Sequence, residues 1–280
     1  MKTRSRPPPG VPARHHFETS EVTLVAPWIS SAHEGLRVAQ ISDVHVGPGT
    51  PAARVRRAVE RINAFRPHLA LLTGDYVTRS KRPVARLREQ LGGIAAPTFV
   101  VLGNHDHQVG AAAIRSSFES IGYTVLQNEH AVVRVGRAPV VVVGVDDGHT
   151  GHDDVGRALH RAPEAATRLV LAHTPVTARK LPEHGRLVCF SGHTHGGQIV
   201  IPRLTEAVLR LADQPFVRGL YEVRGNLLYV NRGLGFGRGS PLLRVGSPPE
   251  VALFTLSRKA PGRRLPAAAE ERRRAEEEGQ

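Results

Sequence analysis

The sequence has a single cysteine, few aromatic residues and no long apolar run. With Cys189 alone the chain has no internal disulfide, and such cysteine usage is typical of a reducing compartment. No stretch approaches the roughly 20 consecutive apolar residues that a membrane span needs. Residues 1–18 contain basic residues but lack the apolar run of a secretory signal. These absences predict a cytoplasmic protein.

The charge is strongly one-sided, with 38 Lys and Arg against 25 Asp and Glu and a formal net charge of +13. This excess favours an anionic partner, either nucleic acid or a membrane surface. An arginine-rich but otherwise ordinary solvated surface explains it equally well. Aromatic residues make up only 5% and do not alternate with the basic ones, unlike a stacking platform for single strands. Nucleic acid is therefore the less favoured partner.

Both ends of the chain differ in composition from the middle. Residues 1–18 are rich in Pro and Arg, and residues 258–280 carry a basic block followed by an acidic one, so both are predicted to be disordered. Residues 19–257 are predicted to form the folded domain. Six apolar runs in it are predicted as buried strands: 36–42, 69–73, 98–102, 140–145, 168–173 and 187–191.

Longer amphipathic stretches separate these runs. Residues 51–65 and 110–121 carry apolar side chains at helical spacing and are predicted as helices. After Gly196 the pattern changes to short β-rich segments at 198–202, 226–231 and 250–256. The whole is predicted to be one α/β domain with a β-rich C-terminal end.

Nearly every predicted core strand is followed by acids, amides or histidines. In α/β sheets ligands gather at the carboxyl ends of strands, so five segments are expected to direct polar groups at one edge. Seven of these residues are candidate metal ligands: Asp43, His45, Asp75, Asn104, His173, His193 and His195. Two further residues of the "GNHD" segment, His105 and Asp106, accompany them.

The chemistry of the seven candidates favours transition metals. Carboxylates, an amide oxygen and imidazoles without a thiolate suit Mn, Fe, Zn, Co or Ni, and disfavour an all-oxygen calcium site. Seven ligands exceed the needs of one tetrahedral ion. They fit two divalent ions about 3.5–4 Å apart that share a carboxylate, an arrangement that clamps the attacking and leaving oxygens of a phosphoryl transfer.

The motifs differ in how specific they are. "DVH" and "GD" are common in ordinary turns, whereas "GNHD" and "GHTH" are rarer. His173 alone has an equally good explanation as a hydrogen-bonded histidine at the end of a strand. The ordered set DxH, GD, GNHD, H and GHTH is much more specific than any of its parts.

In that ordered set the chain resembles the calcineurin-like metallophosphoesterase superfamily, over residues 36–256. The segments "SDVHVG", "LTGDYV", "VLGNHDH", "SGHTHGGQIVIP", "RGLYEV", "LYVNRGLG" and "PPEVALFTL" resemble its bacterial YaeI/YkuE-type branch. The resemblance implies two packed β-sheets flanked by helices in four αββα layers. It also implies hydrolysis of a phosphodiester or diphosphate, with UDP-2,3-diacylglucosamine, a lipid A precursor, among the branch's substrates.

The resemblance further implies a role for each candidate. Asp43, His45 and His195 would hold one metal ion, Asn104, His173 and His193 the second, and Asp75 would bridge them. His105 would stabilise charge on the phosphate or protonate the leaving oxygen, and Asp106 would orient His105. Purple phosphatases of the superfamily have a tyrosine three residues after the bridging aspartate, where this chain has Thr78, so a purple ferric site is not expected.

We therefore expect a hydroxide activated by two divalent ions, manganese among the candidates, to attack phosphorus. The alternatives are a general phosphodiesterase for small molecules or cyclic nucleotides, a nuclease, and, least favoured, a non-catalytic binding scaffold. The stretch 203–244 mixes arginines with apolar residues, which fits a lipid-linked substrate and peripheral contact with the inner face of an anionic membrane. Ordinary surface loops explain this stretch equally well. Arg232 and Arg238 are its candidate substrate contacts.

Overall fold

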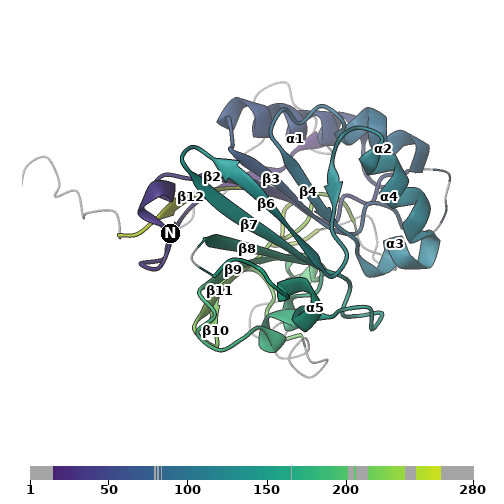
Figure 1. Ribbon diagram of the computed structural model, residues 1–280. Coiled ribbons are helices and arrows are strands. Elements are labelled where there is room, and N and C mark those ends of the chain that lie inside the picture. Colours follow the sequence, from purple (N-terminus) through teal and green to yellow (C-terminus); the bar gives the residue numbers. More distant parts are fainter. Residues whose placement is uncertain are drawn as a thin grey trace, which may run out of the picture.

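The computed structural model describes residues 15–78, 80, 82, 84–164, 166–200, 205, 214–236 and 244–259. Two six-stranded sheets pack face to face, and helices cover their outer sides (Figure 1). The predicted α/β architecture of two sheets flanked by helices is therefore confirmed. The predicted domain limits at residues 18 and 257 stay predictions.

The first sheet has the strand order β1-β12-β2-β3-β4-β5. Strands β2 to β5 are parallel, β12 is antiparallel to β2, and β1 is parallel to β12. Their bounds are β1 Glu18–Val25, β2 Arg37–Ile41, β3 Leu69–Thr73, β4 Thr98–Val101, β5 Thr124–Val125 and β12 Glu250–Ser257.

The second sheet has the order β10-β11-β9-β8-β7-β6. Strands β11, β9, β8 and β7 are parallel, and antiparallel β10 and β6 form the two edges. Their bounds are β6 Glu129–Val135, β7 Ala138–Val145, β8 Thr167–Ala172, β9 Leu187–Ser191, β10 Gly219–Val223 and β11 Asn226–Val230.

Helices lie on both outer faces. In Figure 1, α1, α2 and α4 gather over the first sheet, and α5 lies over the second. The α-helices are α1 Ala52–Phe65, α2 Val84–Leu91, α3 Asn104–Val109, α4 Ala111–Glu119 and α5 Val155–Leu159, and the 3-10 turns are η2 Ser31–His33, η3 Pro175–Lys180 and η4 His195–Gly197. Among the described helices, none has the length and apolar character needed to cross a bilayer.

Strand β7 shows how the layers are built. Val140 and Val142 point into the core between the sheets, whereas Val141 and Val143 pack under the helical layer. Alternate residues of a strand face opposite sides, so a strand covered on both faces is mostly apolar. This explains why the predicted runs coincide with the central strands β2, β3, β4, β7, β8 and β9.

The sequence did not predict the edge strands, because they are only half-buried. Along β1 the more buried residues alternate with the more exposed ones, and neither β1 (ETSEVTLV) nor β6 (EHAVVRV) has an apolar run longer than three residues. The expected β-rich segment 198–202 is not a strand within its described residues. Ile199 makes only an isolated bridge with Val245, and residues 201 and 202 lie outside the described part of the chain.

Candidate metal centre

All seven candidate ligands lie at the carboxyl ends of strands, where the two sheets meet. Asp43 and His45 follow β2, Asp75 follows β3, Asn104 follows β4 and begins α3, His173 follows β8, and His193 and His195 follow β9. Six of them are buried, and His193 is half-buried. Gln40 of β2 connects the two sheets here by a hydrogen bond, in which its Nε2 donates to Ser191 O of β9 at 3.0 Å.

Five of these candidate ligands have a left-handed backbone. The φ angles are 48° at Asp43, 46° at His45, 59° at Asp75, 70° at His193 and 51° at His195. A non-glycine residue in this region costs about 1–3 kcal/mol and persists only where the surrounding structure imposes it. Seven other described non-glycine residues share this conformation, so it supports the sequence motifs only through its five occurrences among the seven candidate ligands.

Asp43, His45 and His195 form a first group, in which one ligand atom of each residue lies within 4.8 Å of the others. The Nε2 atoms of His45 and His195 are 3.2 Å apart, and His195 Nε2 is 3.4 Å from Asp43 Oδ1. A glycine precedes His193 for steric reasons, since a Cβ at Gly192 would collide with the side chain of Asp43.

A second set of contacts surrounds His173. Its Nε2 is 3.4 Å from Asp75 Oδ2 and 3.3 Å from His193 Nδ1, and His193 Nδ1 is 3.1 Å from Asn104 Oδ1. Asp75 reaches both groups, because the same Oδ2 is 3.7 Å from His45 Nε2. Asp43 is also shared, since it forms a potential metal-binding group with Asp75 and His173.

Residues behind the ligands orient two of the imidazoles. His173 Nδ1 donates to Thr73 O at 2.7 Å, and His45 Nδ1 lies 2.9 Å from Thr78 Oγ1. A hydrogen bond at Nδ1 fixes the ring and leaves Nε2 free to bind a cation. In the sequence, Thr78 stands out only as the position where purple phosphatases carry a tyrosine, and this gave no indication of an orienting role.

His195 is held differently. The Nη2 atom of Arg244 is 2.9 Å from His195 Nδ1, and other guanidinium nitrogens of this arginine donate to Arg232 O and Gly235 O. A guanidinium only donates, so Nδ1 accepts and the imidazole proton lies on Nε2. Binding a cation through Nε2 would therefore require this contact to change. Arg244 contacts a candidate ligand, whereas by sequence it belongs only to the stretch 203–244, interpreted either as a lipid- and membrane-contacting segment or as ordinary surface loops.

His105 and Asp106 do not form the expected pair. His105 Nδ1 donates to Thr78 O at 3.2 Å, and its Nε2 lies 4.0 Å from Asp75 Oδ2. Asp106 instead accepts from backbone N–H groups, namely those of Asp75 at 2.8 Å, Gly103 at 2.9 Å, Tyr76 at 2.9 Å and Val77 at 3.3 Å. Asp106 therefore anchors the loop after β3 to the loop after β4, and Thr78 orients the His105 ring.

Burial sets the protonation of the imidazoles. It lowers the pKa of His45 and of His193 to about 4, so both are neutral at neutral pH and can donate a lone pair. Burial alone would also lower the pKa of His173, but the carboxylates of Asp75 and Asp43 outweigh it and hold this pKa well above its usual value. The proton on His173 thus balances the buried negative charge of these carboxylates. A bound cation would balance the same charge and replace the proton.

The pKa values of the two carboxyl groups, Asp43 and Asp75, shift in opposite directions. Burial raises the pKa of Asp43 to about 6. Burial also acts to raise the pKa of Asp75, but the neighbouring His173, His45 and His105 outweigh it and hold the pKa below its usual value. The donor set and its charge therefore fit a divalent transition metal.

Arg232, a predicted substrate contact, is paired within the protein. Its Nη1 is 3.0 Å from Glu18 Oε2, and its Nε is 3.2 Å from Glu250 Oε2. It joins the starts of β1 and β12, and its charge is balanced before any substrate is present. Arg238, the other predicted contact, lies outside the described residues.

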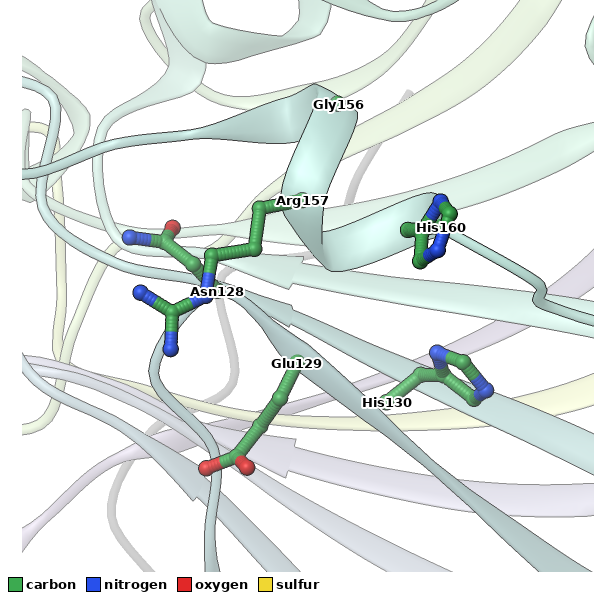
Figure 2. Close-up of a pocket in the computed structure, with 6 residues that line it drawn as sticks. All are labelled: Asn128, Glu129, His130, Gly156, Arg157 and His160. Atoms are coloured by element: carbon green, nitrogen blue, oxygen red, sulfur yellow. The ribbon is translucent and has the colours of Figure 1, made fainter.

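A separate cavity of about 420 Å³ lies between β6 and α5 (Figure 2). His130 and His160 lie at one end of it and Arg157 at the other. None of the candidate ligands lines it. The lining residues are Asn128, Glu129, His130, Gly156, Arg157 and His160.

The chain belongs to the calcineurin-like phosphoesterase family, whose model matches residues 36–197. It is 29% identical to the uncharacterized metallophosphoesterase YkuE of Bacillus subtilis (strain 168), over 86% of each chain. It is 28% identical to the UDP-2,3-diacylglucosamine pyrophosphatase LpxG of Chlamydia trachomatis, over 79% of this chain and 83% of the relative. It is 30% identical to the phosphodiesterase YaeI of Escherichia coli (strain K12), over 77% and 80%.

Among solved structures, the 5'-nucleotidase precursor of Thermus thermophilus shares the fold, with a TM-score of 0.51 and 16% identity. The match covers 79% of this chain and 54% of that one, so the chain spans about half the length of the nucleotidase. The family and its named relatives bear out the prediction of a metal-dependent phosphoric ester hydrolase.

Proposed function

We propose that the protein holds two divalent metal ions and hydrolyses a phosphodiester or diphosphate bond. The observation that carries this proposal is the convergence of Asp43, Asp75 and five nitrogen or amide donors at one edge of the two sheets. Divalent ions bound there would supply Lewis acidity, which lowers the pKa of water and offsets the charge of a phosphate. Manganese is one candidate among several transition metals.

The protein's own residues would divide the remaining work. His45, His195 and Asp43 would hold one ion, and His173, His193 and Asn104 the other. Asp75 would lie between the two ions, because its Oδ2 faces both His45 and His173. A shared carboxylate reduces the repulsion between two nearby cations, since its negative charge lies between them.

His105 would act on the phosphate. With Nδ1 donating to Thr78 O, its Nε2 faces the site beside Asp75. In the doubly protonated form, Nε2 would donate to a phosphate oxygen or to the leaving oxygen while Nδ1 keeps its own partner. Asp106 would support this geometry indirectly by fixing the backbone that carries Asp75.

For the substrate, we propose a phosphodiester or diphosphate linked to a lipid, of the kind exemplified by UDP-2,3-diacylglucosamine. The relative LpxG is named for this substrate, and stretch 203–244 mixes arginines with apolar residues. Such a substrate places the protein at the inner face of a membrane. A nuclease or a general phosphodiesterase would use the same metal centre.

Metal analysis combined with a hydrolysis screen tests the proposal. We expect up to two transition-metal ions per chain, activity that a chelator abolishes, and recovery on adding Mn²⁺. The screen compares bis(p-nitrophenyl) phosphate, UDP-2,3-diacylglucosamine, cyclic AMP and single-stranded DNA. His160→Ala is the matched control for histidine variants of the candidate metal centre, because this exposed histidine lies in the separate cavity of Figure 2.

The outcomes separate the candidates. Full activity of the metal-free protein would overturn the metal mechanism. Preference for DNA, with affinity that falls steeply with salt, would identify a nuclease, because phosphate contacts release counterions. If UDP-2,3-diacylglucosamine and an acyl-free analogue were hydrolysed at equal rates, the protein would be a general phosphodiesterase.

A further inference from the structure

Four large apolar side chains are exposed in the described part of the chain: Val132 by 55%, Ile199 by 40%, Leu220 by 47% and Val245 by 46%. Val132 and Leu220 belong to β6 and β10, the edge strands of the second sheet. Single exposed apolar residues on such strands are ordinary. Ile199 and Val245 differ, because they lie outside the strands and face each other.

A short backbone bridge holds this pair together. Ile199 and Val245 are partners in an isolated parallel bridge. Val200 N donates to Val245 O at 2.8 Å, and Val245 N donates to Gln198 O at 3.0 Å. Two apolar side chains are thus fixed side by side in solvent, where neither contributes to a core.

The pair lies at the rim of the metal centre. Ile199 follows the ligand His195 by four residues, and Val245 follows Arg244, whose Nη2 is 2.9 Å from His195 Nδ1. Ser247 Oγ also donates to His195 O at 2.8 Å. A substrate whose phosphate reached the candidate ligands would therefore extend past Ile199 and Val245 if it left on this side.

Positive charge accompanies the pair. Arg218 Nη1 donates to Gly246 O at 3.0 Å, and no carboxylate of the described residues forms an ion pair with it. An apolar pair beside an arginine suits the boundary between acyl chains and anionic headgroups.

We infer that Ile199 and Val245 form a membrane-docking edge of the metal centre, which inserts among the acyl chains of an anionic bilayer. The inference rests on the proposed function, because it explains how a lipid-linked phosphodiester or diphosphate meets the ligands without leaving the membrane. The headgroup phosphates lie opposite Arg218, and the apolar pair enters the layer beneath them.

Vesicle flotation tests the docking edge. Vesicles of phosphatidylglycerol and phosphatidylcholine in a 1:3 ratio are compared with pure phosphatidylcholine, for the wild type, for the double variant Ile199→Ser/Val245→Ser, and for the control Val132→Ser. Val132 is the more exposed residue, and the control lies on β6, away from the bridge. Removing two partly inserted side chains should weaken partition onto the anionic vesicles about 10-fold or more, with the control unchanged.

A gain-of-contact variant covers the case in which the double variant folds poorly. Ile199→Trp should show a blue-shifted emission on adding the anionic vesicles, since tryptophan favours the membrane interface. Val132→Trp should show no shift beyond that of the native Trp28. Both measurements depend on binding alone, so they are independent of whether the metal centre hydrolyses any test substrate.

Three results would overturn the inference: a wild type that ignores anionic vesicles, equal flotation of the wild type and the double variant, or equal losses in the double variant and Val132→Ser. Absence of hydrolysis in the wild type, with flotation as expected, would instead count against the proposed function.

Discussion

Replacing Asp106 by asparagine should destabilise the fold more than it alters the chemistry. The Asp106 carboxylate accepts from four backbone N–H groups, those of Asp75, Gly103, Tyr76 and Val77, at 2.8 to 3.3 Å. In Asp106→Asn an NH₂ group replaces one oxygen and faces two of these donors. An unsatisfied buried donor costs about 1–3 kcal/mol, so the free energy of unfolding should fall by about 2–6 kcal/mol.

The assay is urea denaturation of the metal-free protein at pH 8. Burial raises the pKa of Asp106 to about 7, so the carboxyl group is mostly ionised at this pH. Metal-free conditions matter because a cation that binds only the folded state would add its own stabilisation. Asp154→Asn is the matched control. Asp154 is exposed and accepts from Arg157 N as the N-cap of α5. Asparagine caps equally well, so the control should change stability little.

An Asp106→Asn variant that unfolded like the wild type would show that Asp106 does not anchor the loops after β3 and β4. Suppose that the stability of Asp106→Asn is unchanged but its kcat falls as much as is predicted below for His105→Ala. Asp106 would then act on the His105 ring, as the family resemblance first implied. That outcome would also contradict the observed contacts, in which His105 Nδ1 donates to Thr78 O.

Three further predictions concern the metal centre. His105→Ala should lower kcat on bis(p-nitrophenyl) phosphate by about 10²–10⁴-fold with an unchanged metal content, and loss of an ion would make His105 a ligand. Asp75→Asn should release more metal than Asp43→Asn, because its Oδ2 lies between His45 and His173; the reverse order would give the shared position to Asp43. Thr78→Val removes the partner of His45 Nδ1 and should weaken metal affinity about 10–100-fold by calorimetry, and an unchanged affinity would deny Thr78 an orienting role.

The sequence by itself determined the central strands and the location of the candidate ligands. Strands covered on both faces are mostly apolar, so β2, β3, β4, β7, β8 and β9 were visible as nearly continuous apolar runs. The carboxyl ends of parallel strands meet at one edge, which predicted that polar residues after those runs would converge. Edge strands such as β1 and β6 have neither a long apolar run nor a clear polar–apolar alternation, so only the structure identifies them as strands.

Only the tertiary structure decided what surrounds the candidate ligands. Arg232 finds its partner Glu18 at a separation of 214 residues, Arg244 meets His195 across 49 residues, and Thr78 reaches His45 across 33. Each contact depends on how separate loops pack at the edge of the sheets, which no local pattern encodes. Motif spacing predicts which side chains gather at a strand end because strand geometry is regular. The residues that orient those side chains or balance their charge lie in irregular loops, and the packing of these loops decides where each partner lies.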